Sequence, residues 1–106
     1  MKLYSLNGYK HLALLRGQYV RGNLALVLRD QDDLSPYATL TVNLGTGDGL
    51  EPYQAYVDTN NLGSDIIDWI EENEIGTPTG KRKKSGFCVY PLVEFNKTLV
   101  DSLESI

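Results

Sequence analysis

The sequence predicts an α+β fold: a mostly antiparallel sheet of about five short strands, with one main helix at about 62–74 packed on one face. Three observations lead to this fold class. Several short segments alternate apolar and polar residues, turn residues separate them, and one longer segment repeats its apolar residues at helical spacing. The 106 residues suit a single domain, 1–106, which can bury a modest core without disulfides or metals.

Strands are expected on both sides of that helix. Residues 37–44 (YATLTVNL) alternate cleanly and predict a strand with one exposed face, whereas residues 23–29 (NLALVLR) are apolar on both faces and predict a strand covered on both. The Asn7-Gly8 pair is typical of a tight hairpin turn. Residues 45–52 hold three glycines and predict a loop. We expect strands at 2–6, 9–19, 23–29, 37–44, 53–58 and 87–90.

The helix is expected to begin at a cap provided by Asn60 or Asn61. Gly76 is placed for a left-handed stop, and Pro78 prevents the helix from continuing. We therefore expect residues 77–84 to form a loop, followed by a strand that Pro91 ends or places at an edge. The apolar residues of the helix define a stripe that would cover the sheet: Leu62, Ile66, Ile67, Trp69 and Ile70.

Composition and charge exclude several classes of protein. The net charge of -4 predicts no bulk attraction to nucleic acid or to anionic lipid. One cysteine, Cys88, and one histidine, His11, cannot supply a disulfide framework or a structural zinc set, so we expect no metal and no cofactor. No run approaches the ~20 apolar residues that cross a bilayer, and the first residues lack the apolar core of a signal peptide. We expect a cytoplasmic protein with no membrane partner.

No set of catalytic residues is readable, so we expect no enzyme. Cys88 lies in the apolar segment FCVY, which is typical of a small core residue. The glycines at 45, 47 and 49 lack the Lys-Ser/Thr of a Walker loop and the following helix of a dinucleotide loop. The acids at 30, 32 and 33 lack the Gly and Glu of a calcium loop.

The predicted helix carries an acidic face. No basic residue lies between 60 and 80 to neutralise it. Such a face can occupy a basic groove on a protein partner, or it can be a solvated helix surface with no partner. The candidate protein-binding residues are Asp65, Asp68, Glu71 and Glu72.

A run of four cations follows the helix. Such a run in a flexible loop can grip the phosphates of nucleic acid or of a nucleotide, or it can be the solvated tip of a hairpin. Nothing in the sequence places aromatic side chains among the cations, as single-strand binders usually do. The candidate nucleic-acid-binding residues are Lys81, Arg82, Lys83 and Lys84.

Three segments, VDTNNLG at 57–63, PTG at 78–80 and SGFC at 85–88, carry a resemblance to a family. Over about residues 23–96 the chain is similar to small uncharacterised proteins found on plasmids, conjugative elements and phages of Firmicutes. The resemblance implies no known activity and no catalytic residue. It does imply a mobile genetic element, where small acidic proteins are often accessory factors.

Two hypotheses follow from the charged segments and this resemblance. The first is a non-enzymatic accessory binding protein of a mobile element that acts through its acidic surface, for example as an anti-CRISPR or anti-restriction inhibitor of host defence. The alternative is a small nucleic-acid or nucleotide-binding protein that uses residues 81–84. Both a monomer and a homodimer remain open.

Overall fold

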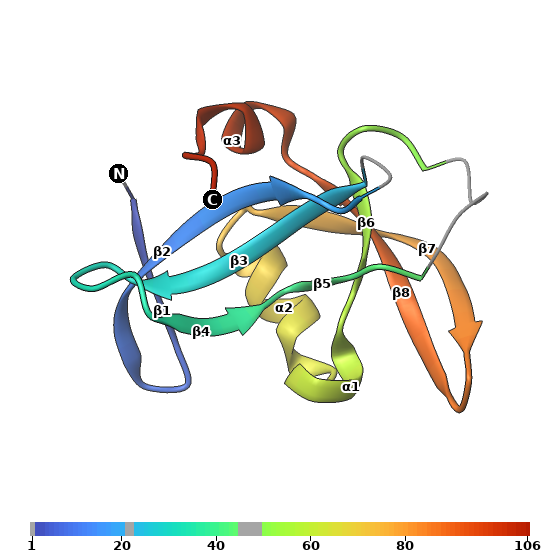
Figure 1. Ribbon diagram of the computed structural model, residues 1–106. Helices are drawn as coiled ribbons and strands as arrows, with labels where there is room; N and C mark the ends of the chain where they lie inside the picture. The colour runs from blue at the N-terminus through green and yellow to red at the C-terminus, as the bar shows by residue number, and fades with distance from the viewer. Residues whose placement is uncertain (1, 21–22, 45–49) are drawn as a thin grey trace.

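Two four-stranded antiparallel sheets and three short helices make up the part of the chain that the computed structural model describes, residues 2–20, 23–44 and 50–106 (Figure 1). The first sheet has the order β1-β2-β3-β4, with bounds Leu3–Leu6, Tyr9–Gln18, Leu24–Asp30 and Pro36–Thr39. The second has the order β5-β6-β8-β7, with bounds Thr41–Val42, Gln54–Val57, Cys88–Phe95 and Gly76–Ser85. The α+β class and the antiparallel pairing are therefore confirmed, with two sheets instead of one. The predicted glycine loop lies largely outside the described residues, because 45–49 are not among them.

The expected strand at 37–44 is wrong in one respect, because it divides at Leu40 between the two sheets. The Leu40 N–H donates to the Leu26 carbonyl oxygen in β3 (2.9 Å), and the Leu40 carbonyl accepts from the Asp58 N–H at the end of β6 (2.9 Å). Thr41 follows it into the interior, where its hydroxyl accepts from the Leu26 N–H (3.2 Å) and bonds the Tyr19 hydroxyl (2.9 Å). Two consecutive buried residues break the alternation, and this kink joins the sheets.

The single helix expected at 62–74 is instead a pair, α1 (Thr59–Leu62) and α2 (Asp65–Glu72). Asp58, and not an Asn, caps α1: its carboxylate accepts from the Asn61 N–H (3.2 Å) and side-chain amide (2.7 Å). Gly63, with φ 83°, separates the helices. The apolar stripe is confirmed, since Ile66 and Ile70 are buried and the rest packs against the core.

The end of α2 also differs from the prediction. Glu74 takes the left-handed conformation (φ 58°), and the Ile75 N–H bonds the Ile70 carbonyl (2.9 Å). Gly76 does not stop the helix; it is buried and begins β7. The expected loop at 77–84 is therefore wrong, because these residues lie in a ten-residue strand.

The core lies between the two sheets and α2. Its largest fully buried side chains come from both sheets and from the segments after them: Phe95, Leu12, Leu14, Leu26, Leu28, Leu40, Ile70, Ile75, Val57, Val93 and Val100. At the top of Figure 1, α3 (Lys97–Ser102) covers the upper end of this core and buries Val100. No helix in the described ranges is both long enough and apolar enough to cross a membrane.

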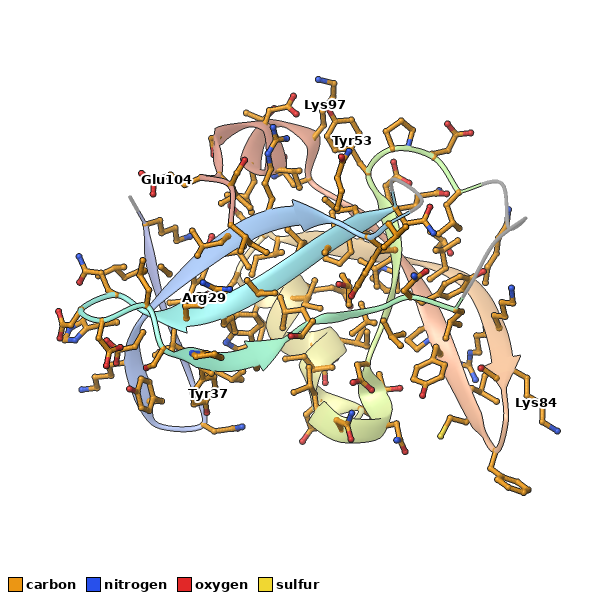
Figure 2. All side chains as sticks on the ribbon, in the orientation of Figure 1. Arg29, Tyr37, Tyr53, Lys84, Lys97 and Glu104 are labelled. Atoms are coloured by element: carbon orange, nitrogen blue, oxygen red, sulfur yellow. The ribbon has the colours of Figure 1, made fainter. Side chains whose placement is uncertain are left out.

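A polar cluster fixes α3 to the rest of the protein. Asp101 accepts from the Tyr53 hydroxyl (2.6 Å) and pairs with the Lys97 ammonium (2.7 Å), and Figure 2 shows Tyr53 and Lys97 close together beside α3. The hydrogen bonds from Lys97 and then Tyr53 lower the pKa of Asp101. After α3 the chain returns to β2, where the Ile106 N–H bonds the Arg16 carbonyl (2.9 Å).

Candidate functional site

The β7–β8 hairpin forms one edge of the second sheet, and its outer half, which carries the cations, extends beyond the rest of that sheet (Figure 1). Its root is held in the core through the pairs Gly76–Phe95 and Pro78–Val93. Its tip is a two-residue turn between the paired residues Ser85 and Cys88, with positive φ at Gly86. One end of the hairpin is therefore anchored and the other is surrounded by solvent.

A bulge in β7 separates the root from the outer half. The register shifts between Pro78 and Arg82, so that three residues of β7 lie opposite a single residue of β8. Gly80 in this bulge has φ 88°, and the Thr79 hydroxyl donates to the Leu92 carbonyl (3.0 Å) while accepting from the Lys81 N–H (3.1 Å). Bulges bend a strand and increase its twist. The bulge therefore marks the point where the basic part of the hairpin begins.

The predicted cations lie on this strand and not on a loop. Lys81, Arg82 and Lys84 are exposed, and Lys83 is half-buried. Since side chains alternate along a strand, Arg82 and Lys84 share one face and Lys83 the other. Figure 2 shows Lys84 pointing away from the body of the protein near the tip. The four cations thus occupy both faces of the outer half of the hairpin. We call this segment, Lys81 to Lys84, the basic arm.

An aromatic side chain, Phe87, lies at the end of the basic arm, beyond the four cations themselves. Phe87, at the turn, has an exposed fraction of 104%, and Val89 beside it is 50% exposed. Tyr90 lies opposite Lys83 in the register. Phe87 buries none of its side chain within the described chain, so its ring is accessible to a ligand. Gly86 and Phe87 form the turn, so the strand expected at 87–90 begins one residue later, at Cys88.

A groove of about 400 Å³ runs between the outer half of the hairpin and the two helices α1 and α2. Its apolar wall comes from Ile67, Pro78, Val89 and Pro91. Arg82 lies in the lining too, on the same face as Val89 and Pro91 because it pairs with Pro91. Pro91 does not end the strand: it lies within β8, one residue before the first that pairs with β6. The groove is thus apolar inside and basic along one edge.

The predicted acidic face is divided between two other grooves. Asp65, Asp68 and Glu72 line one of about 450 Å³, between α2 and the turn after β1. Glu71 lines another of about 400 Å³ at the hairpin root, together with Glu74 and Glu94. The structure therefore does not bring all four predicted acidic residues to one site.

Ion pairs within the described ranges do not join the predicted acidic residues to the exposed cations Lys81, Arg82 and Lys84. Between described residues, the ion pairs join Asp101 to Lys97 (2.7 Å) and to Arg16 (3.9 Å).

Comparison with protein families gives one match. The family model described as "Domain of unknown function (DUF4313)" matches residues 12–104. The chain belongs to the DUF4313 family. The match begins within β2, continues through α3 and extends beyond the 23–96 of the sequence resemblance. Neither the comparison with curated proteins nor the comparison with solved structures gives a match.

Cys88 and Tyr90 are neighbouring titratable groups near the hairpin tip of the DUF4313 domain. Cys88 is half-buried beside the hairpin tip, so its assignment to the core is wrong. The hydrogen bond with Cys88 is the largest cause that raises the pKa of Tyr90, and burial adds to it. Within the described ranges, no three His, Cys, Asp or Glu side chains lie close enough together to hold a metal ion.

Proposed function

We propose that this DUF4313 domain binds nucleic acid through the basic arm. The observation that carries the proposal is the fully exposed Phe87 at the tip of a hairpin whose strand β7 holds four consecutive cations. Lys and Arg side chains bind phosphates whatever the base sequence, and an exposed aromatic ring stacks on a base. In this hairpin the four cations and the ring lie within seven consecutive residues, 81–87.

The distribution of charge along the hairpin supports a binding site at its outer half. Glu71, Glu74 and Glu94 surround the root, where Thr77 pairs with Glu94. Carboxylates repel phosphates, so a polyanion is directed away from the root and toward the tip. The net charge of -4 therefore does not prevent binding, because the local field of the basic arm acts within a Debye length of about 8–10 Å.

Replacing two cations of one face, Arg82→Gln with Lys84→Gln, tests the proposal. For a labelled oligonucleotide, the slope of log K against log salt should become shallower by about 1.4–1.8, because two phosphate contacts are lost. Fluorescence anisotropy between about 50 and 200 mM salt measures this slope. The matched control, Lys2→Gln with Lys10→Gln, removes the same charge from exposed sites away from the hairpin and should leave the slope unchanged. An equal loss in both variants, or a wild-type chain that binds nothing at low salt, would refute the proposal.

A second candidate is a protein partner on the acidic side of α2. Asp65, Asp68 and Glu72 are exposed, lack an ion pair with any described residue, and line one groove beside Trp69. Trp69 is fixed there because its indole N–H donates to the Ser5 carbonyl (2.8 Å). We propose that this surface occupies a basic groove on its partner. An accessory role on a mobile element, including inhibition of a host defence nuclease, and a cytoplasmic location belong to the same proposal and depend on the family resemblance.

The pair Asp68→Lys with Glu72→Lys tests this second candidate. Capture of a host protein by the immobilised chain should be lost. The circular dichroism spectrum should be unchanged, and the free energy of unfolding should stay within about 0.5 kcal/mol of wild type, as for surface substitutions. Glu71→Lys with Glu74→Lys is the matched control, because these residues line the other groove. Capture that survives the first pair would show that this surface of α2 has no such role.

A further inference from the structure

We infer that the nucleic acid bound by the basic arm is single-stranded, with one unstacked base in the groove between the hairpin and helices α1 and α2, and another stacked on Phe87. This inference rests on the proposed function and specifies its substrate. It depends on three features of the described residues: the apolar lining of the groove, the position of the cations at its edge, and the open ring at the tip.

The lining of the groove favours an unpaired base. Ile67, Pro78, Val89 and Pro91 present apolar surface, and the rim adds the polar residues Thr59 and Ser64. In a duplex the faces of the bases are stacked on each other, so only base edges and the charged backbone reach a protein. An unpaired base presents its apolar face as well as its polar edges. The apolar wall can therefore pack against the face of an unstacked base, whereas a duplex offers it little apolar surface to bury.

The cations are placed to hold the backbone of that strand. The register pairs Arg82 with Pro91 and Lys84 with Val89, so both cations project from the same face of the hairpin as the apolar wall. Arg82 itself lines the groove. A strand whose base enters the groove thus brings its phosphates to Arg82 and Lys84 in succession. The positive charges of Arg82 and Lys84 are complementary to the negative phosphates, and for this reason we infer that the occupant is a polyanion.

The tip supplies a second stacking surface. Phe87 is fully exposed, so both faces of its ring are open, and it lies only three residues beyond Lys84. Aromatic rings on single-strand binders stack with bases of any sequence. Along the arm the groove comes first, then the cations and then the ring of Phe87. A nucleic-acid strand presents a base, then phosphates and then another base in the same order. The alternative occupant is duplex DNA, into which Phe87 would insert between two base pairs. Comparing the binding of single strands and of duplexes distinguishes the two occupants.

Binding of oligo(dT) and oligo(rU) to the full chain, compared with a duplex of the same length at the same salt, tests the inference. We expect single strands to bind at least about tenfold tighter than the duplex. Phe87→Ala should weaken single-strand binding about 5- to 150-fold, with an unchanged salt slope because no charge is removed, and Phe87→Trp should restore it. Val20→Ala, which removes an equally exposed apolar side chain elsewhere, is the matched control.

Titration of the ¹⁵N-labelled chain with oligo(dT) tests the groove directly. The amides of Ser64, Ile67 and Val89 should shift, and shifts confined to the hairpin tip would overturn the assignment of the groove. Duplex binding as tight as single-strand binding would overturn the inference but leave the proposed function standing. Binding of neither would overturn both. Sedimentation of the wild-type chain gives the last outcome. If the chain binds no oligonucleotide but forms a dimer that Phe87→Ala dissociates, the tip and groove would bind a second copy of the chain.

Discussion

Leu40→Ala should lower the free energy of unfolding by about 2–5 kcal/mol. Leu40 is completely buried where the chain leaves the first sheet for the second, and its N–H and carbonyl each bond a different sheet. Removing its side chain takes away buried apolar surface and leaves a cavity that the neighbouring strands cannot fill, because their hydrogen bonds hold them apart. Urea or thermal unfolding followed by circular dichroism measures the loss, at about 4–8 °C of melting temperature for each kcal/mol.

Leu34→Ala is the matched control for that substitution. Leu34 lies in the turn between β3 and β4 and is 52% exposed, so the same chemical change should alter stability by about 0.5 kcal/mol or less. Equal effects at the two positions would mean that Leu40 does not lie between the sheets.

Gly76→Ala should lower the free energy of unfolding by about 1–3 kcal/mol. A Cβ added to Gly76 would lie 2.9 Å from Val93 Cγ1 and 3.0 Å from the Glu94 carbonyl oxygen. The oxygen belongs to the backbone of β8, which is paired with β7 at this point, so it cannot move without breaking the root of the hairpin. Chemical denaturation measures this loss as well.

Two further substitutions separate this steric reason from the left-handed stop that the sequence suggested. Asn tolerates the left-handed region better than Ala does. If Gly76 were a left-handed stop, Gly76→Asn would therefore destabilise the protein less than Gly76→Ala. In a crowded strand the larger Asn side chain should destabilise it more. Glu74, at φ 58°, is where the left-handed residue lies. Glu74→Gly should therefore leave stability unchanged or raise it by up to about 1 kcal/mol. Destabilisation by Glu74→Gly together with tolerance of Gly76→Asn would restore the original prediction.

Local patterns were enough to predict the parts of the fold in which the chain interacts with its own neighbours. The Asn7-Gly8 turn has the positive φ angles of 53° and 82° that its residue types favour. The stripe that includes Ile66 and Ile70 is buried because its spacing matches one face of a helix. The alternation around residues 37–44 correctly indicated extended chain. These predictions held because the interactions that decide them lie within a few residues.

Strand β7 could not be predicted in this way. Its outer half, Lys81 to Lys84, shows no alternation of apolar and polar residues, because most of it faces solvent on both sides. Those residues are extended because β8 pairs with them, and pairing of this kind depends on the partner strand and not on intrinsic preference. The break at Leu40 was missed for a similar reason, since two sheets compete for its backbone.

The sequence by itself determined the fold class, the family, and the presence of an acidic helix followed by a basic run, because these follow from residue type and spacing. Only the tertiary structure decided what those charges can do. Packing of α2 between other elements divides its acids between two grooves, and pairing with β8 turns the basic run into an arm with Phe87 at its tip. Both the division of the acidic residues and the extended conformation of the basic run depend on contacts between residues that are distant in sequence.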